Sequence, residues 1–336
     1  MSEKVQILKK RIEENLLGHF SKVVPLNHPI NQAYRYAVFP PGKLFRPLLV
    51  MAIAEDFDKY FDTKNTNRTK IYPNHCYFAS AMELHHAYTL VHDDLPCVDN
   101  DVQRRGRPTL HVEFGEWQAL LVGDGLLNAS YQLLAKIQID CIGELIKFVS
   151  CCLGPRGLVQ GQVLDLSGSV DFTVLLRMLE YKTSRLIQAS LVGSAAITIA
   201  EKKKFNEKLI SINSNQQRRI LLDLFCVGKH LGLVFQLLDD LCDLVEQAES
   251  DHEMEVNTFI IDPLEPNRQL LASIAELRKF INKYQLQVLQ MVLSEYFFKT
   301  RSSLQRHQAV IENKLSGRGG KTSFSVVPII DELSFF

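Results

Sequence analysis

Apolar residues recur at alternating spacings of three and four along almost the whole of this 336-residue chain. This is the pattern of helices that each bury one face. Convincing alternation of apolar and polar residues, the pattern of a half-buried strand, is missing. The sequence therefore predicts an all-α fold. Helices are expected at residues 3–20, 28–38, 43–61, 75–95, 115–137, 140–152, 156–167, 172–200, 216–247, 266–295 and 297–315.

Two polar stretches, residues 62–67 and 211–217, interrupt this pattern and are expected to be loops within one domain. After Ser316 the composition changes to a glycine-rich segment followed by an apolar one. We therefore expect a single all-helical domain over residues 1–315, followed by a C-terminal tail over residues 316–336 that forms a loop or an extended segment.

The charges of the chain balance, with 38 Lys and Arg residues against 38 Asp and Glu residues. This balance excludes a nucleic-acid-binding protein that depends on overall positive charge. The seven Cys residues form no CxxC pattern, which favours reduced thiols over a zinc site or a disulfide framework. The first residues lack the apolar region of a signal peptide, and the longest strongly apolar stretch, residues 191–200, is about half a membrane span. We expect a cytoplasmic protein with no membrane span and no nucleic-acid partner.

Paired carboxylates, Asp93 and Asp94, end the periodic segment 75–95. Pro96 cannot continue a regular helix, so we expect the chain to bulge there and to bring Asp99 back towards Asp93. Arginines follow at once, and guanidinium groups beside carboxylates suit a site that holds a divalent cation together with a diphosphate. The alternative is an acidic helix end neutralised by arginines. It is the weaker interpretation, because carboxylates at a helix C-terminus oppose the helix dipole.

A second set of polar side chains lies in the segment 216–247. Gln236, Asp239, Asp240 and Asp243 follow one another at spacings that place them on one helix face. Carboxylates stacked on one face repel one another unless a cation lies between them. A solvated acidic face is the alternative, but two such clusters in an otherwise apolar helical chain favour a metal-dependent site.

With these clusters the chain resembles the trans-prenyl diphosphate synthases of the farnesyl/geranylgeranyl type. Residues 93–99 are similar to the bacterial form of the family's first motif, DDxxxxD, and residues 239–243 to its second motif, DDxxD. Other matching segments occur in the family's order over roughly residues 30–245. They are Gly42-Lys43 with Arg46-Pro47, residues 123–127, Gly161-Gln162 with Asp165-Leu166, and Lys182-Thr183.

The resemblance implies an isoprenoid-synthase bundle of about ten or more helices around a deep central cavity, usually in a homodimer. It also implies a prenyltransferase that joins isopentenyl diphosphate head to tail with a short allylic diphosphate, dimethylallyl or geranyl. Three Mg²⁺ ions would lie between the allylic diphosphate and the two Asp clusters, and an apolar cavity would protect the allylic cation from water.

Residue roles follow from the resemblance by motif position. The metal ligands are expected to be Asp93, Asp99 and Asp239, with Asp94, Asp240 and Asp243 in supporting positions. The allylic diphosphate is expected to be bound by Arg104 and Lys182, and the reaction centre to be lined by Thr183 and Gln236. Isopentenyl diphosphate is expected to be bound by Lys43, Arg46, His86 and Arg105. The other histidines nearby, His85, His92 and His111, are expected to be ordinary packed or surface residues without a role in the site.

The resemblance also bears on product length. In this family the side chain five residues before the first Asp helps to form the floor of the hydrophobic pocket. Here that side chain is Tyr88, followed by Thr89. Five residues span ~7.5 Å of helix, a depth suited to a short isoprenoid tail. This favours farnesyl diphosphate as the product, with geranylgeranyl diphosphate as the alternative.

One segment departs from the family pattern. Residues 239–267 contain ten acidic residues and no Lys or Arg, although the family places a diphosphate-binding Lys here, about where Glu253 stands. Two alternatives follow: an active synthase with a rebuilt clamp, drawing on Arg318 or Lys321, or a weakly active or non-catalytic partner of another synthase. A terpene cyclase is disfavoured because a cyclase needs no isopentenyl diphosphate site.

Overall fold

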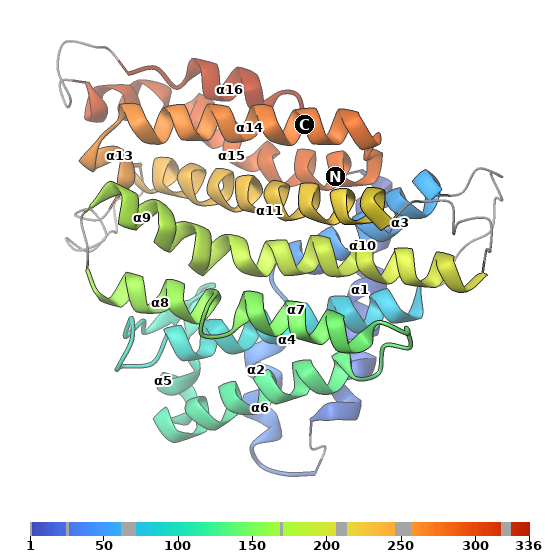
Figure 1. The fold of residues 1–336 in the computed structure, drawn as a ribbon. Coiled ribbons are helices and arrows are strands. Elements are labelled where there is room, and N and C mark those ends of the chain that lie inside the picture. Colours follow the sequence, from blue (N-terminus) through green and yellow to red (C-terminus); the bar gives the residue numbers. More distant parts are fainter. Residues whose placement is uncertain are drawn as a thin grey trace. The chain divides into compact units, whose positions relative to one another are not determined.

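The computed structural model describes residues 2–24, 27–61, 72–168, 171–205, 214–245, 257–316 and 324–336. Over these ranges the chain is almost entirely helical (Figure 1). Strands in this part of the chain are limited to β1 (Gln103–Arg104) and β2 (Arg107–Pro108), which form a short antiparallel hairpin. The all-α prediction is therefore confirmed.

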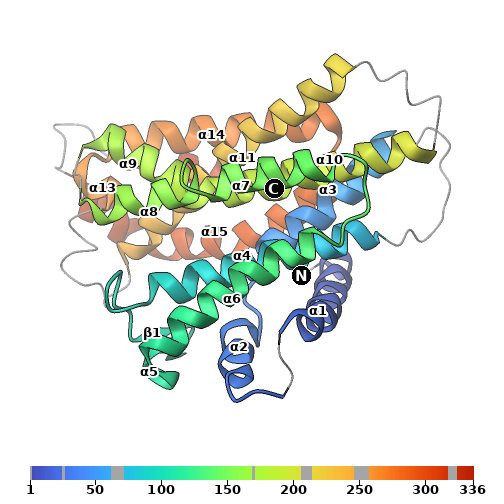
Figure 2. The same cartoon turned by 60° about the horizontal axis from the view of Figure 1, so that its bottom comes forward.

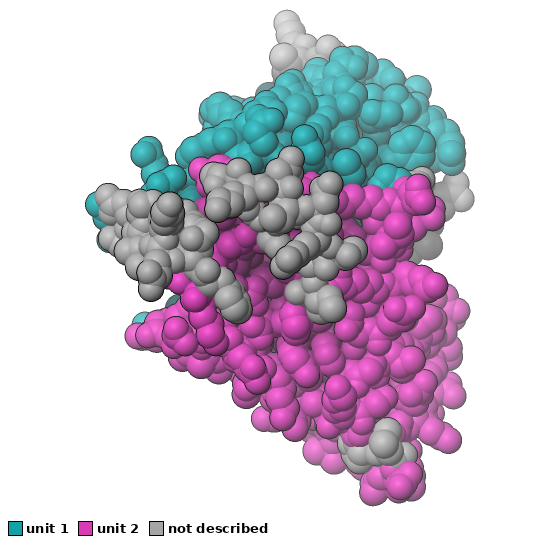
Figure 3. Space-filling view, turned by 90° about the vertical axis from the view of Figure 1, so that its right-hand side faces the viewer, with its two compact units in different colours: residues 1–2, 150–192, 212–336 teal, residues 3–149, 193–211 magenta. Residues whose placement is uncertain are grey.

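The chain divides into two compact units, which Figure 3 shows in different colours. Unit 1 contains residues 1–2, 150–192 and 212–336, and unit 2 contains residues 3–149 and 193–211. The first Asp cluster belongs to unit 2 and the second to unit 1. Each unit is described by itself below, and the single domain expected over residues 1–315 stays a prediction.

Unit 2 is organised around helix α4, which contacts α1, α3 and α6 (Figure 2). Helix α4 is buried on most sides, through side chains such as Phe78, Met82 and Leu84, as expected for a helix that is apolar nearly all round. It therefore forms a rigid support for the carboxylates at its end. The helices that begin in this unit are α1 (Glu3–Val23), α2 (Asn31–Val38), α3 (Phe45–Phe61), α4 (Pro73–Asp93), α5 (Leu110–Phe114), α6 (Glu116–Leu134) and α7 (Ile142–Leu153).

Unit 1 is organised around helix α11 (Ser214–Asp243), which contacts α14, α15 and the π-helix η1. Residues 215–243 are long and apolar enough to cross a membrane, but half of their apolar window is buried inside the chain, so this one helix is weak evidence for a membrane span. The other helices that begin in this unit are α8 (Leu158–Leu166), α9 (Phe172–Leu179), η1 (Glu180–Ser184), α10 (Arg185–Phe205), α13 (Thr258–Ile261), α14 (Leu264–Tyr284), α15 (Gln287–Leu315) and α16 (Val327–Leu333).

Several predicted boundaries were wrong. The break expected at residue 296 lies instead at Gln285, which adopts a left-handed backbone (φ 53°) between α14 and α15. Residues 214–217, expected in a loop, begin α11, and the expected C-terminal loop or extended tail contains α16, which packs on α14 and α15. The short helices α5 and α13 were not predicted. The loop at residues 62–67 lies outside the described residues.

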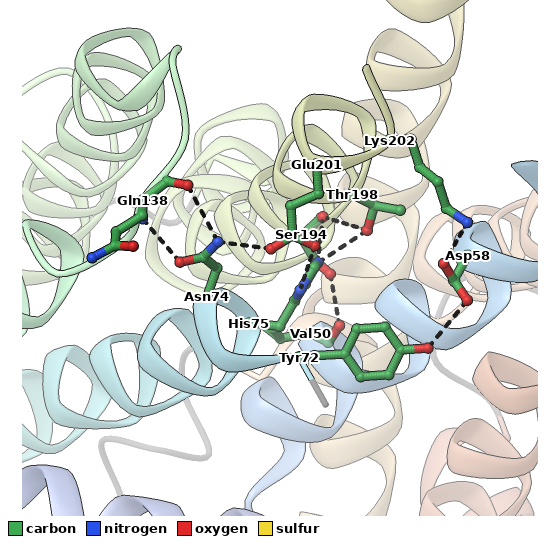
Figure 4. Close-up of polar contacts among 10 residues, drawn as sticks. All are labelled: Val50, Asp58, Tyr72, Asn74, His75, Gln138, Ser194, Thr198, Glu201 and Lys202. Atoms are coloured by element: carbon green, nitrogen blue, oxygen red, sulfur yellow. Dashed lines mark hydrogen bonds and ion pairs between the residues drawn. The ribbon is translucent and has the colours of Figure 1, made fainter. Parts of the chain in front are cut away.

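A buried polar network joins α4 to α10 within unit 2 (Figure 4). The imidazole Nε2 of the fully buried His75 lies 3.2 Å from the Ser194 carbonyl oxygen and 3.0 Å from the Thr198 hydroxyl. The neighbouring Asn74 amide donates to the Glu201 carboxylate at 2.7 Å. Desolvation lowers the pKa of His75 from 6.5 to about 4, and burial raises the pKa of Glu201.

We expect the free energy of unfolding to decrease as the pH falls from 6.5 to about 4, because only the unfolded chain binds a proton at His75 in this range. At 1.36 kcal/mol per pH unit, the contribution is about 3 kcal/mol. Urea denaturation as a function of pH measures it. His75→Gln should remove this contribution of about 3 kcal/mol between pH 6.5 and about 4, and the exposed control His28→Gln should leave the pH dependence unchanged. A His75→Gln curve parallel to that of the wild type would contradict the expectation.

Candidate active site

The first Asp cluster lies where α4 ends and the chain folds back on itself. The backbone N–H of Asp99 donates to the carbonyl of Asp93 at 2.9 Å, and that of Asn100 donates to the carbonyl of Leu95 at 3.1 Å. Asn100 has a left-handed backbone (φ 54°), which closes the loop around Pro96. The predicted return of Asp99 towards Asp93 is therefore confirmed.

The two adjacent carboxylates of this cluster have different surroundings. Asp94 is only 4% exposed and accepts a hydrogen bond of 2.6 Å from Arg104 Nε. A second nitrogen of Arg104 donates to Asp101 at 3.0 Å. Burial raises the pKa of Asp94, although the Arg104 guanidinium opposes this effect. Asp93 is half-buried and Asp99 is exposed. Asp94 thus anchors Arg104, and Asp93 and Asp99 are the more exposed carboxylates of the cluster.

The residues expected to bind isopentenyl diphosphate are brought together in the same unit. The guanidinium of Arg105 lies directly against Gly42. A Cβ atom added at Gly42 would be only 2.5 Å from Arg105 Nη2, so a larger residue would not fit there without a shift. Desolvation, and then the charges of Arg46 and Arg105, lower the pKa of His86 well below its ordinary value. Lys43 follows Gly42 and is exposed. This part of unit 2 therefore gathers cationic groups of the kind that bind a diphosphate.

Sequence reasoning missed Glu83, a buried carboxylate one turn before His86 on α4. Burial raises the pKa of Glu83, and the opposite charges of Arg46 and Arg105 lower it. Glu83 thus supplies the counter-charge for two guanidinium groups that would otherwise repel each other. An acidic residue inside an apolar helix, three positions before His86, was the available signal.

Tyr88 is 8% exposed and lies on α4 between two histidines. Its ring makes edge contacts with His85 and His92, with ring centres 4.6 and 5.7 Å apart. Burial raises the pKa of Tyr88 to about 12, and Tyr131 of α6 adds to the effect. The half-buried Thr89 donates its hydroxyl to the His86 carbonyl at 2.8 Å.

The three histidines expected to have no role in the site make contacts that fit this expectation. His85 lies 3.4 Å from the Ser130 hydroxyl, and His92 lies 3.1 Å from the Leu120 carbonyl oxygen. Both contacts join α4 to α6. His111 of α5 lies 3.1 Å from the Thr109 hydroxyl.

In unit 1, Lys182 and Thr183 lie in the π-helix η1, a wider turn that often marks a functional site. Gly161 of α8 allows η1 to approach closely, since a Cβ atom there would be 2.3 Å from the Lys182 backbone nitrogen. The Lys182 ammonium donates to the Asp165 carboxylate, and the Thr183 hydroxyl donates to the Gln236 side chain at 3.2 Å. The structure therefore pairs two expected site residues and gives Asp165 a role that the sequence did not suggest.

The second Asp cluster, like the first, contains one buried carboxylate and two more exposed ones. Asp240 is buried and accepts a 2.6 Å hydrogen bond from the Thr258 hydroxyl, and its own carbonyl accepts one of 2.7 Å from Asn257. Burial raises the pKa of Asp240. Asp239 is exposed and Asp243 is half-buried. In both clusters, therefore, the second Asp is buried and anchors the chain, and the remaining carboxylates are more exposed.

A cation from a distant part of the sequence lies just beyond the second cluster. The Lys314 ammonium of α15 donates to the Leu244 carbonyl at 2.5 Å, one residue past Asp243. A positive charge at the C-terminus of α11 complements the helix dipole and offsets the nearby carboxylates. The positions considered from sequence, Glu253, Arg318 and Lys321, lie outside the described residues.

The more exposed carboxylates fit Mg²⁺ by the chemistry of their donors. No group of three or more His, Cys, Asp or Glu side chains forms a metal cage in the described ranges. Mg²⁺ does not need such a cage, because it binds through one or two carboxylates, several waters and substrate phosphates. Asp93 with Asp99, and Asp239 with Asp243, could each supply hard oxygen ligands of this kind.

Comparisons with known proteins identify the family of the chain. Residues 27–254 match the family model described as polyprenyl synthetase. Farnesyl diphosphate synthase of Micrococcus luteus is 33% identical over 273 residues, which cover 77% of this chain and 84% of that protein. Geranylgeranyl diphosphate synthase of Cyanophora paradoxa is 31% identical over 251 residues, which cover 72% of this chain and 74% of that protein.

A solved structure of similar fold is the geranyltransferase of Helicobacter pylori complexed with magnesium and isoprenyl diphosphate. It has a TM-score of 0.70 and 26% sequence identity, and the match covers 88% of this chain and 98% of that one. The helical fold and the paired Asp clusters define a prenyltransferase, and the chain belongs to the polyprenyl synthetase family. The resemblance to the trans-prenyl diphosphate synthases is thereby confirmed.

Proposed function

We propose that this protein condenses isopentenyl diphosphate with dimethylallyl or geranyl diphosphate, head to tail, and that its main product is farnesyl diphosphate. The observation that carries the choice of product is the buried ring of Tyr88, five residues before Asp93 on the central helix of unit 2. An aromatic ring so near the carboxylates limits the depth available to a growing chain. Relatives of both product classes match at similar identity, so geranylgeranyl diphosphate is the alternative.

Within the proposed reaction, Asp93, Asp99 and Asp239 would hold three Mg²⁺ ions, with Asp94, Asp240 and Asp243 in support. Bound Mg²⁺ would neutralise the allylic diphosphate and make it a better leaving group. The protein's own contribution is to hold two cationic side chains in place. Asp94 and Asp101 hold Arg104, and Asp165 holds Lys182, so that both cations are ordered before substrate arrives.

The remaining proposed roles follow the same geometry. Thr183 and Gln236 form one hydrogen-bonded pair that would line the reaction centre. Burial and the charges of Arg46 and Arg105 lower the pKa of His86, and its imidazole would donate a hydrogen bond to diphosphate. Lys43, Arg46 and Arg105 would supply the positive charge for isopentenyl diphosphate.

We also propose a cytoplasmic homodimer. Support comes from exposed apolar side chains on one face of α6, where Trp117, Leu120 and Leu121 are 62, 47 and 48% exposed. Leu120 and Leu121 lie three and four positions after Trp117, so the three side chains share one helix face, which is suited to packing against another helix.

Replacement of Tyr88 by Ala is expected to lengthen the product by one or two isoprene units, because the ring that limits the pocket is removed. Chromatography of the dephosphorylated products measures chain length. Tyr88→Phe is the matched control, since it retains the ring and should retain the wild-type product. An unchanged product from Tyr88→Ala would contradict the proposed role of this side chain.

The choice of product is tested with labelled isopentenyl diphosphate, Mg²⁺ and three allylic starters. We expect farnesyl diphosphate from dimethylallyl and geranyl diphosphate, and no extension of farnesyl diphosphate. Extension of farnesyl diphosphate would favour the geranylgeranyl alternative. Absence of turnover with every starter would favour a non-catalytic partner of another synthase.

A further inference from the structure

Arg107 joins the β1–β2 hairpin to the end of helix α2. Its two terminal nitrogens donate to the backbone carbonyls of Tyr36, at 2.6 Å, and of Phe39, at 3.1 Å. Its guanidinium carbon also lies 4.2 Å from the centre of the Tyr36 ring. The Arg107 side chain therefore holds both the last turn of α2, at Tyr36, and the residue that follows the helix, Phe39.

Tyr36 completes this connection from the other side. Its hydroxyl donates to the carbonyl of Pro108 at 2.8 Å, and its ring packs edge-on against Phe114 of α5 at 5.3 Å between ring centres. The two residues thus make reciprocal hydrogen bonds, each to the backbone of the other's segment. We call this set of contacts the Arg107–Tyr36 lock.

The lock lies between two pieces of the site proposed for isopentenyl diphosphate. On one side of it the chain continues from Phe39 through Gly42 and Lys43 into α3. On the other side, Arg104 pairs with Arg107 across the hairpin, and the tight turn at Arg105 and Gly106 has a left-handed backbone (φ 55° and 75°). The Arg105 guanidinium touches Gly42 directly. The hairpin and the segment after α2 are therefore in contact at two places, at Arg105 with Gly42 and at the Arg107–Tyr36 lock.

We propose that Arg107 and Tyr36 are positioning residues for isopentenyl diphosphate, which set Arg105 against the Gly42-Lys43 loop before the substrate binds. This inference rests on the proposed function. The guanidinium is used for its geometry, because its rigid planar fork presents two separate nitrogens to the two carbonyls, whereas a lysine offers one nitrogen on a flexible stem. Neither residue needs to touch the substrate, since both act through the backbone that carries Arg105 and Lys43.

Steady-state kinetics of Arg107→Met test the proposal. We expect the KM for isopentenyl diphosphate to rise about tenfold, with kcat and the KM for the allylic substrate within about twofold of wild type. Arg107→Lys should resemble Arg107→Met, because charge alone does not replace the fork. Arg35→Met is the matched control, since this exposed arginine stands on α2 beside Tyr36 and its guanidinium faces the Phe39 ring at 5.7 Å. It should leave all three constants unchanged.

Hydrogen exchange separates failure of this inference from failure of the proposed function. Arg107→Met should accelerate exchange at residues 39–47 and leave α14 unaffected, whether or not the protein turns over substrate. Equal changes in both KM values, full rescue by Arg107→Lys, or unaltered exchange at residues 39–47 would each overturn the positioning role. A wild type that is inactive with every allylic starter would contradict the proposed function. The hydrogen-exchange result would still show whether Arg107 orders residues 39–47.

Discussion

Replacement of Asp93 by Asn is expected to lower kcat by about 10³ and to leave the melting temperature within about 2 °C of the wild-type value. Asp93 is half-buried at the end of α4, next to a loop that the backbone already closes. The change removes a negative oxygen ligand from a proposed Mg²⁺ site, and the amide that replaces it has almost the same size. Initial rates over a range of Mg²⁺ concentrations, together with thermal unfolding, measure both effects.

The neighbouring Asp94 is a useful comparison because its carboxylate is buried and holds Arg104, so its replacement should also reduce stability. Asp94→Asn weakens a buried hydrogen bond to Arg104, so we expect a loss of about 2 kcal/mol in the free energy of unfolding. Asp140 is an exposed carboxylate before α7, and Asp140→Asn should change neither kcat nor stability. Wild-type kcat in Asp93→Asn at low Mg²⁺ concentration would contradict the assignment of Asp93 as a metal ligand.

Replacement of Gly161 by Ala is expected to reduce both stability and activity. The added Cβ would lie 2.3 Å from the Lys182 backbone nitrogen and 2.6 Å from the Tyr181 carbonyl carbon. Backbone atoms cannot rotate away as a side chain can, so α8 and η1 must separate. We expect a loss of about 3 kcal/mol in the free energy of unfolding. Because the displaced turn carries Lys182 and Thr183, we also expect a fall of about tenfold or more in kcat.

Gly143→Ala is the matched control for this substitution. Gly143 also lies in a helix, α7, but an added Cβ there meets nothing within 4 Å. Ala has the higher helix propensity, so this variant should be more stable than wild type by up to about 1 kcal/mol. Urea denaturation compares the two variants directly. Equal stability of Gly161→Ala and Gly143→Ala would show that the close approach of α8 to η1 is not required.

The fold class was predictable because periodic burial of apolar side chains is a local pattern that each helix repeats. Boundaries without such a signal were not predictable. The break at Gln285 has a left-handed backbone but neither Gly nor Pro, so nothing in the sequence marks it. Helix α16 follows a glycine-rich segment, and its packing on α14 and α15 depends on contacts far apart in the sequence.

In the candidate site too, features set by neighbouring residues were predictable, and contacts between residues far apart in the sequence were not. The loop that brings Asp99 to Asp93 was predictable from Pro96, because proline interrupts a helix wherever the rest of the chain lies. The partners of the charged residues were not predictable in this way. Lys314 lies 70 positions from Leu244, and Arg107 lies 71 positions from Tyr36, so only the folded chain brings them together.

The central claim is that the two Asp clusters support Mg²⁺-dependent prenyl transfer in this chain, although residues 239–267 lack any Lys or Arg. The most direct measurement is the incorporation of labelled isopentenyl diphosphate into geranyl diphosphate by the purified wild-type protein, with Mg²⁺ and then with excess chelator. We expect a longer labelled prenyl diphosphate with Mg²⁺ and none with chelator. No incorporation at saturating Mg²⁺ and substrate, by a protein that is folded, would contradict the claim.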